Sequence, residues 1–333
     1  MAQSKSVLIM GGSGQAGGGA AALLRQWHRR LPLTIAGRNA ERAARVAADL
    51  GNATAVTLDL RRSDLGLPAE PAYSAVIAAV WDAQLHGLRY AQRNAVPYLG
   101  ISSGLVDIGP EVVAGAQRPG AAPILLASHY LAGLVVLATL HFAREFDRVD
   151  AIRIGAVLDE TDAGGPAAIA DLERLLAATS AGLIRRDGVF TWLPEEQAGA
   201  EVRRIDGTSL PGRTIPILDV PSLALATGAP EVRFDFAVGE SASRRRGGPP
   251  SLETRIELAG VGPAGTSLTR SRYLFHPAGQ RPLTALGVAL GAERLLGLRG
   301  DPVAAGLHTP EGLVDPAHAV ERMIEVGATF TDA

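Results

Sequence analysis

A glycine-rich segment near the start of the chain constrains the fold more strongly than any other feature. Residues 7–10 are four consecutive apolar residues, which is the pattern of a buried strand, and glycines follow them directly. Gly12, Gly14 and Gly17 have the spacing G-x-G-x-x-G, and apolar residues recur after them at helical intervals. Strand, tight turn and helix in this order predict a dinucleotide-binding turn.

The three glycines have different physical roles in such a turn. Gly12 lets the chain turn sharply, Gly14 lets the backbone approach a pyrophosphate, and Gly17 lets the helix pack closely on the strand. Free N–H groups at the positive end of the helix then face the phosphates. Ser13 and Gln15 lie between these glycines, and we include both among the expected cofactor-binding residues. A glycine-rich turn without a ligand is the alternative.

The next predicted strand, residues 33–37, ends where a dinucleotide fold selects its cofactor. NAD enzymes usually place Asp or Glu there, whereas this strand ends at Gly37 and continues with Arg38 and Asn39. A carboxylate would repel the 2′-phosphate of NADP, but a guanidinium binds it through paired, charge-assisted hydrogen bonds. Arg42, one helical turn further on, could supply a second cation. We therefore expect NADP as the cofactor. The alternative is a solvated Arg38, although a helix N-terminus is an unfavourable place for a cation without an anion.

The bulk properties of the chain exclude several kinds of protein and of chemistry. Its 333 residues suffice for two domains, and its formal charge of −2 gives no reason to expect nucleic acid or an acidic membrane as a partner. Disulfides, thiolate nucleophiles and cysteine-ligated metals are excluded because there is no cysteine. No His-x-x-x-His pair occurs either, so we expect no metal. Residues 1–6 are too short and polar for a signal peptide, which favours a cytoplasmic protein.

Lysine chemistry is not expected either. Lys5 is the only lysine, and every other cation among the 32 lysines and arginines is an arginine. Lys5 precedes the first strand, on the far side from any cofactor. A Schiff-base mechanism, a lysine general base and the Tyr-x-x-x-Lys pair of short-chain dehydrogenases are therefore not expected.

Residues 41–145 continue the alternation of helix and strand, which predicts a doubly wound parallel sheet. Residues 73–80 are almost wholly apolar, as is typical of a parallel strand covered by helices on both faces. Asp59 follows another strand, at a position where such folds often contact the adenine. The apolar run 130–140 is too short to span a membrane. The predicted strands are residues 53–58, 73–80, 96–101 and 123–127, and the predicted helices are residues 41–50, 83–94 and 131–145.

From Asp147 onward the sequence takes on the alternating pattern of half-buried strands. This pattern predicts a mainly antiparallel sheet with one solvated face, and an uncovered face makes a homodimer our expectation. Residues 241–250, which contain three consecutive arginines from Arg244 to Arg246, predict an exposed loop. The predicted strands are residues 149–154, 188–193, 232–238, 252–258 and 267–275, and the predicted helices are residues 167–181, 281–298 and 315–326.

Three segments resemble a known family. They are the glycine turn together with Ala36-Gly37-Arg38-Asn39, the segment 96–102, and the tail Gly306-Leu307-His308-Thr309-Pro310-Glu311 followed by Val314-Asp315-Pro316. These residues resemble the saccharopine dehydrogenase-like NADP-binding proteins. The resemblance implies a Rossmann domain in residues 1–145 and an inserted α+β domain in residues 146–280 that carries the substrate face and the dimer contact. It also implies that residues 281–333 return to the Rossmann domain.

Two segments depart from the family pattern. The family usually has Tyr-x-Asp where this chain has Tyr98-Leu99-Gly100, and Gly-x-x-Pro-Gly is common where this chain has residues 128–133. The amino-acid substrates of the family are therefore not carried over to this chain. The lysine-based acid–base chemistry of the fungal saccharopine enzymes is not carried over either.

The reacting groups are expected after the carboxyl ends of the strands, where a nicotinamide delivers its hydride. Val80 and Trp81 follow the fourth predicted strand and Ser102 follows the fifth, so we assign these three residues to the cofactor pocket. A core aromatic residue is the alternative for Trp81. Asp82, the next residue, is expected to cap the helix that follows it.

One proton donor is needed to reduce a ketone or an imine. His129 follows the sixth predicted strand and can donate a proton near neutral pH, with the adjacent Tyr130 as second choice. A helix-capping or core histidine is the alternative for His129.

These residues predict an NADP-dependent oxidoreductase that acts on a carbonyl or imine of a small-molecule substrate. The alternative from another class is a catalytically inactive NADP-binding protein that serves as a sensor or regulatory partner. The departure at residues 128–133 and the missing lysines make that alternative credible.

Overall fold

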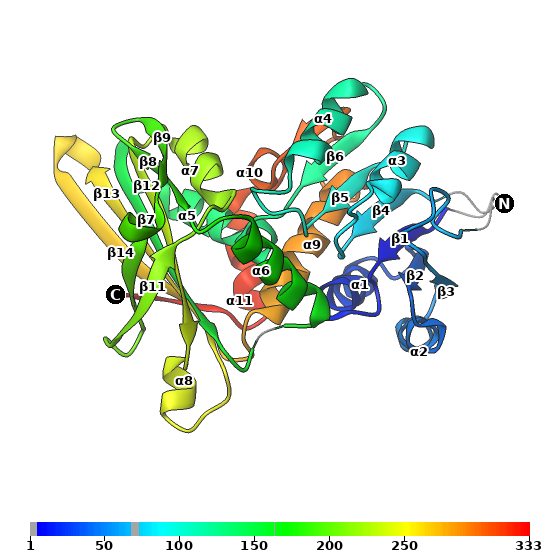
Figure 1. The fold of residues 1–333 in the computed structure, drawn as a ribbon, viewed down its shortest axis with the longest axis horizontal. Helices are drawn as coiled ribbons and strands as arrows, with labels where there is room; N and C mark the ends of the chain where they lie inside the picture. The colour runs from blue at the N-terminus through cyan, green and yellow to red at the C-terminus, as the bar shows by residue number, and fades with distance from the viewer. Residues whose placement is uncertain (1–4, 68–72, 163) are drawn as a thin grey trace. The chain divides into compact units, whose positions relative to one another are not determined.

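The structure, a computed structural model, describes residues 5–67, 73–162 and 164–333 (Figure 1). The chain forms two compact units. Unit 1 comprises residues 1–128 and 284–314, and unit 2 comprises residues 129–283 and 315–333. The sequence predicts that residues 1–6 are not a signal peptide, and residues 1–4 of this segment lie outside the described residues.

Unit 1 is built around a parallel sheet of seven strands in the order β15-β6-β5-β4-β1-β2-β3. Strands β1, β2 and β4 are buried along their whole length because helices lie on both faces of the sheet (Figure 1). The strand order reverses at β1, as in doubly wound sheets that bind ligands at this reversal. The strands are β1 (Val7–Met10), β2 (Leu33–Gly37), β3 (Ala53–Thr57), β4 (Ala75–Ala78), β5 (Tyr98–Gly100), β6 (Pro123–Leu126) and β15 (Gly306–His308).

The helices of unit 1 follow its strands. Helix α9 (Arg281–Leu295) belongs to this unit from Thr284 onward, and it packs on α1 and on strands β5 and β6 through two glycines. A Cβ at Gly19 would lie 2.6 Å from the Ala285 Cβ, and a Cβ at Gly291 would lie 2.7 Å from Leu125. The other helices are α1 (Gln15–Trp27), α2 (Ala40–Leu50), α3 (His86–Arg93), α4 (Gly109–Gln117) and α10 (Pro310–Leu313).

Unit 2 contains a second sheet of nine strands, and this sheet is mainly antiparallel, as predicted. Its longest strands pair in the order β12-β7-β13-β14, of which only β12 and β7 run parallel. The strands are β7 (Arg148–Asp159), β8 (Gly182–Arg186), β9 (Val189–Leu193), β10 (Gly199–Arg203), β11 (Ser209–Thr214), β12 (Glu231–Gly239), β13 (Leu252–Val261), β14 (Ser267–His276) and β16 (Thr329–Asp332).

Short helices complete unit 2. Among the described residues, none of the helices of either unit is long and apolar enough to cross a membrane. The helices of unit 2 are α5 (Leu134–Ala143), α6 (Pro166–Ala178), α7 (Asp219–Thr227), α8 (Ala242–Arg245) and α11 (Pro316–Glu325), and 3₁₀ turns occur at Tyr130–Gly133, Glu195–Gln197 and Pro263–Gly265.

The division into units differs from the expected boundaries at residues 145 and 281. Helix α5 lies in unit 2 because it packs against α7 and α11. The chain returns to unit 1 only for residues 284–314, after which α11 and β16 rejoin unit 2, where β16 pairs with β14. The chain therefore returns to the unit of the parallel sheet, but only for residues 284–314 and not to its end.

Two local predictions need correction. The helix expected from Leu131 begins only at Leu134, because Leu131 and Ala132 have φ angles of +53° and form a 3₁₀ turn. Residues 241–250 were expected to form an exposed loop, but they contain α8. Ser241 and Ala242 at the start of this segment are fully buried. Carboxylates of neighbouring strands cap this helix: Ser241 N donates to Asp159 and Ala242 N donates to Glu253.

Candidate dinucleotide-binding site

The turn after β1 is tied to the neighbouring strand β2. The N–H groups of Gly11 and Gly12 donate to the Ala36 carbonyl at 2.9 and 3.2 Å, and Gly14 N donates to the Gly11 carbonyl at 2.8 Å. Gly11 has a φ of +76°, a conformation that favours glycine. These bonds hold the turn at the carboxyl end of β1.

The space around Gly12 and Gly17 supports the roles predicted for them. A Cβ at Gly12 would lie 2.8 Å from the Ile9 carbonyl oxygen, so the sharp turn has no room for a side chain. A Cβ at Gly17 would lie 2.7 Å from the Gly11 oxygen, so only glycine lets α1 approach the turn this closely. Gly14, in contrast, is exposed, and among the described residues a Cβ there would meet only the Gly11 oxygen, at 3.1 Å.

The N-terminus of α1 is open to an anion. Gly14 is the N-cap residue, and among the described residues no side chain caps it and no acidic residue occupies the first turn. The first N–H groups of a helix have no partners within the helix, and they lie at its positive end. With Gly14 and Gln15 exposed, this end of α1 suits a phosphate.

Arg38 follows directly at the end of β2, beside the glycine turn. A Cβ at Gly37 would lie 3.1 Å from Ser13 Oγ, which shows how close the turn and this strand end are. Arg38 is exposed, and its side chain makes no hydrogen bond or ion pair with the residues that the structure describes. The same holds for the Arg42 side chain. Asn39 caps α2 by accepting a hydrogen bond from Arg42 N at 2.8 Å.

Asp59 has a local structural role in the turn after β3. Its Oδ1 accepts hydrogen bonds from Arg61 N at 3.0 Å and from Arg61 Nε at 3.1 Å. These hydrogen bonds lower the pKa of the Asp59 carboxyl. The expected contact with an adenine stays a prediction.

The residues after β4 approach the glycine turn, as expected for a strand that neighbours β1. A Cβ at Gly11 would lie 2.8 Å from the Ala79 oxygen and 3.3 Å from the Val80 Cβ. Trp81 is 38% exposed, and Ser102 is buried. Their roles at a nicotinamide stay predictions.

Asp82 caps α3, as predicted. Its carboxylate accepts hydrogen bonds from His86 N at 3.0 Å, Gly87 N at 2.7 Å and Leu88 N at 3.3 Å. Burial raises the pKa of this carboxyl, although the three N–H groups oppose the rise.

Glu111 is a buried acid in unit 1 that the sequence analysis missed. Its side chain meets Tyr98 at Gly100, where a Cβ would lie 3.3 Å from the Tyr98 hydroxyl and 3.5 Å from Glu111 Oε1. Glu111 Oε2 is buried and has no hydrogen-bond partner among the described residues. Burial raises the pKa of Glu111 to about 7, the charges of Asp82 and Asp107 add to the rise, and a Ser103 hydrogen bond opposes it. The sequence signal for the start of α4 is the segment Asp107-Ile-Gly-Pro110-Glu, because proline is common in the first turn of a helix.

His129 and Tyr130 lie in unit 2, whereas the glycine turn, Arg38 and Trp81 lie in unit 1. His129 is 6% exposed, and its Nε2 is hydrogen-bonded to Ser222 Oγ at 2.8 Å. Tyr130 N donates to Asp219 Oδ2 at 2.9 Å. Their catalytic roles stay predictions.

The Tyr130 phenol is packed in the core of unit 2. Its ring makes edge contacts with Phe234 and Phe236, with centroids 5.5 and 6.2 Å apart. Burial raises the pKa of the phenol, the nearby carboxylates of Asp162 and Asp219 raise it further, and Thr254 lowers it. A phenol with a raised pKa releases its proton less readily, so this packing makes Tyr130 a weaker proton donor.

Neither unit shows a metal centre: among the described residues, no group of three His, Asp or Glu side chains could hold a metal ion. No protein-family model matches the sequence. No curated protein matches it either.

Solved structures resemble the chain over its whole length. Apo saccharopine dehydrogenase (L-Glu forming) from Saccharomyces cerevisiae has 12% sequence identity and a TM-score of 0.67, with 99% of this chain and 100% of that chain covered. A myo-inositol dehydrogenase from Corynebacterium glutamicum has 14% identity and a TM-score of 0.46, with 99% of each chain covered. Levoglucosan dehydrogenase in complex with NADH and levoglucosan has 13% identity and a TM-score of 0.47, again with 99% of each chain covered.

The match to saccharopine dehydrogenase confirms, for the fold, the resemblance of the sequence to saccharopine dehydrogenase-like proteins. A parallel sheet and a mainly antiparallel second sheet were both expected from that resemblance and from the apolar patterns, although the seventh strand of the parallel sheet, β15, was not. The chain therefore has the fold of saccharopine dehydrogenase, a Rossmann-type unit combined with a second, mainly antiparallel sheet.

Proposed function

We propose that the protein is an NADP-dependent oxidoreductase that transfers a hydride between NADPH and a carbonyl or imine carbon of a small metabolite. The observation that carries this proposal is the glycine turn with its open helix N-terminus, beside an exposed Arg38 that makes no ion pair with a described residue. The fold shared with saccharopine dehydrogenase supports the same general class. A homodimer and a cytoplasmic location stay predictions.

The residues of unit 1 would hold the pyrophosphate and the 2′-phosphate of NADP. The first N–H groups of α1, beginning at Gln15, would bind the pyrophosphate, because they lie at the positive end of the helix. The Arg38 guanidinium would grip the 2′-phosphate with two parallel hydrogen bonds, and Arg42 would add a second positive charge. The bound nicotinamide supplies or accepts the hydride.

A proton must accompany the hydride when a carbonyl is reduced. The hydride adds to carbon and the proton to oxygen, so one side chain must hold a proton that it can release. We propose His129 for this role, with Tyr130 second. His129 directly follows Ser128. The Ser128 Oγ accepts a hydrogen bond from the N–H of Ser103, a residue that follows β5, at 3.0 Å.

Cofactor titration tests the proposal. NADPH and NADH are titrated against the wild type and Arg38→Gln, with the quenching of protein fluorescence as the readout. The wild type should prefer NADPH. Arg38→Gln should weaken NADPH binding by roughly 10- to 100-fold, because charge-assisted hydrogen bonds contribute about 1.5–3 kcal/mol. NADH binding should not change.

Arg45→Gln is the matched control, since Arg45 is another exposed arginine of α2. It should bind both cofactors as the wild type does. Equal wild-type affinity for NADH and NADPH, or no binding of either, would contradict the proposal.

A second candidate function is a protein that binds NADP without turnover. The observation in its favour is that the polar groups of the two expected donors are engaged in the packing of unit 2: His129 is bonded to Ser222, and the Tyr130 hydroxyl is buried. NADPH oxidation across a panel of ketones, keto acids and amine–carbonyl pairs separates the two. Turnover that His129→Gln abolishes supports the enzyme, and NADPH binding without turnover on any panel member favours the sensor.

A further inference from the structure

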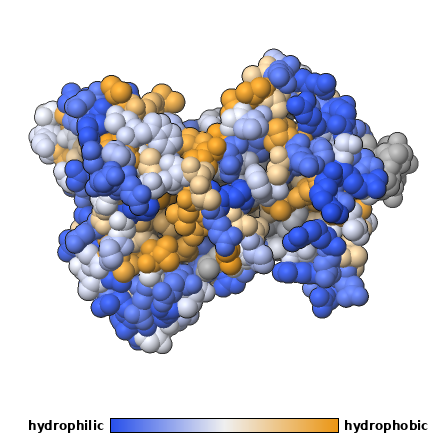
Figure 2. Space-filling view, viewed as in Figure 1, coloured by the Kyte–Doolittle hydropathy of each residue, from blue (hydrophilic) through white to orange (hydrophobic). Residues whose placement is uncertain are grey.

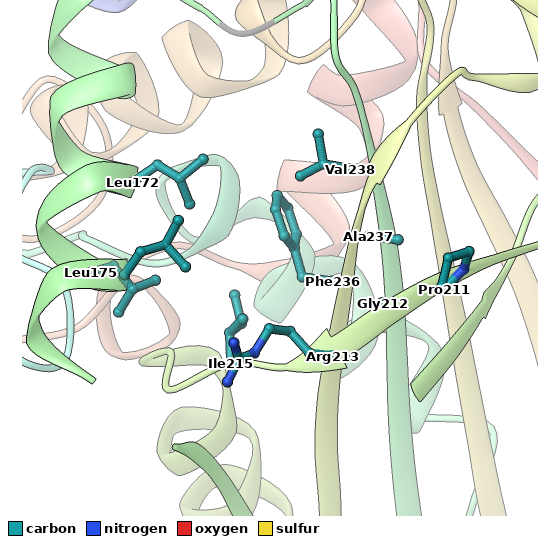
Figure 3. Close-up of a pocket in the computed structure, with 10 residues that line it drawn as sticks. Leu172, Leu175, Pro211, Gly212, Arg213, Ile215, Phe236, Ala237 and Val238 are labelled. Atoms are coloured by element: carbon teal, nitrogen blue, oxygen red, sulfur yellow. The ribbon is translucent and has the colours of Figure 1, made fainter. Parts of the chain in front are cut away.

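Unit 2 contains a cavity of about 330 Å³ between a helix and a sheet face (Figure 3). Leu172, Leu175 and Leu176 of α6 line one side, and Phe236 and Val238 of β12 line the other. Arg213 of β11 lies at the same face, because its register partner is Phe236. The volume is at the small end of the range for ligand pockets, which is roughly 300–1,000 Å³.

The apolar walls of this cavity are partly exposed to solvent. Leu176 is 55% exposed and Val238 is 50% exposed, and α6 has no buried residue. In Figure 2 hydrophobic side chains gather on the surface where Figure 1 shows α6 and β11. An apolar molecule in the cavity would remove this surface from water, which favours binding.

The two walls differ in how firmly they are held. The Phe236 ring is packed against Tyr130, whose backbone N–H is in turn bonded to Asp219 of α7. Leu172 and Leu175 point from α6 toward the Phe236 side of the cavity (Figure 3). The sheet side is thus a preformed wall, and a ligand would give α6 a second surface to pack on.

Arg213 is the one charged residue among the described residues that line the cavity. It donates one hydrogen bond to the Ser180 carbonyl oxygen and makes no ion pair with a described carboxylate. A guanidinium has five donors, so most of its donors and its whole charge remain for another partner. A single cation beside an apolar cavity selects a ligand with one anionic end.

We propose that this cavity is a binding site for a small monocarboxylate with an apolar chain or ring. The apolar part lies between the α6 leucines and Phe236, and the carboxylate pairs with Arg213. The site is made by unit 2 alone, so the proposal goes beyond the proposed function and stands without it.

Calorimetric titration of the full chain with octanoate and with 1-octanol tests this site, because the two probes share a chain and differ in charge. Octanoate should bind about tenfold more tightly than 1-octanol, as expected for a charge-assisted pair. Arg213→Gln should remove that preference and leave 1-octanol binding unchanged. Arg186→Gln, at an exposed arginine that ends β8, is the matched control and should bind both probes as the wild type does.

Leu172→Glu tests the apolar wall, because it places a negative charge inside the cavity on a helix with no buried residue. It should abolish octanoate binding while the melting temperature stays at the wild-type value. The proposal is overturned if the wild type does not bind octanoate, if it binds 1-octanol equally well, or if Arg213→Gln has no effect. NADPH titration of the same samples keeps the two proposals apart, since failure of octanoate binding alone leaves the dinucleotide site intact.

Discussion

Burial of Glu111 links the ionisation of one side chain to the stability of unit 1. Its carboxyl is 2% exposed, and one of its oxygens has no hydrogen-bond partner among the described residues. The folded protein therefore favours the protonated acid, and burial raises the pKa from the usual 4.5 to about 7. A carboxyl whose pKa is raised on folding stabilises the fold most below its unfolded pKa, and this stability is lost as the pH rises through the folded pKa.

The free energy of unfolding should consequently fall between about pH 5 and about pH 8, by roughly 2–3 kcal/mol from this group, since one pKa unit corresponds to about 1.4 kcal/mol. Glu111→Gln keeps the shape but cannot ionise, so it should lose most of this fall and be the more stable protein at the higher pH. Urea unfolding at both pH values measures the effect. Glu41→Gln, at an exposed glutamate of α2, is the control. An unchanged pH dependence in Glu111→Gln would show that Glu111 is already ionised in the fold.

The packing of whole elements in unit 1 depends on glycines where helices meet. Helix α9 approaches α1 at Gly19 and lies over β5 and β6 at Gly291, where a Cβ would lie 2.9 Å from Leu99. His28 at the end of α1 is also bonded to Glu293 of α9, with 2.8 Å between Nε2 and Oε1. These contacts join a helix close to the start of the chain with one close to its end.

Gly19→Ala should lower the free energy of unfolding by about 1–3 kcal/mol, because the added Cβ would lie 2.6 Å from the Ala285 Cβ and overpacked cores typically lose that much. Denaturant unfolding measures the change. Gly109→Ala is the comparison: it lies in the first turn of α4, where a Cβ meets nothing within 4 Å. Equal stability of the two variants would mean that α1 and α9 do not meet as described.

The elements that the sequence predicts are those whose signal is local. The strand, glycine turn and helix of residues 7–27 and the apolar run of β4 depend on neighbouring residues only, and both were predicted. Strands β15 and β16 were not predicted, because three or four residues form a strand only beside β6 and β14, which are distant in the sequence. Helices α4 and α7 were also missed, since each has nine residues and weak periodicity.

The same limit applies to the candidate sites. The spacing of the glycines and the position of Arg38 after β2 are visible in the sequence, and the glycine turn and the end of β2 lie side by side in unit 1. The burial of Glu111 depends on the packing of α4, and the cavity beside Arg213 depends on how α6 lies on β11 and β12. Packing between distant segments leaves no local pattern from which these features could be inferred.

At the scale of the whole molecule, the chain passes between the units after Ser128, after Leu283 and after Val314. Each unit nevertheless has its own sheet and its own buried core. The glycine turn and Arg38 lie in unit 1, and the cavity beside Arg213 lies in unit 2. The two candidate sites are therefore built from different units.

Hydrogen–deuterium exchange of the full chain with and without NADPH shows where the dinucleotide binds. If NADPH binds at the glycine turn and Arg38, amide exchange should slow in peptides that cover residues 11–19 and 37–42, and octanoate should give no such protection. NADPH binding that leaves the exchange of both segments unchanged would rule out this site.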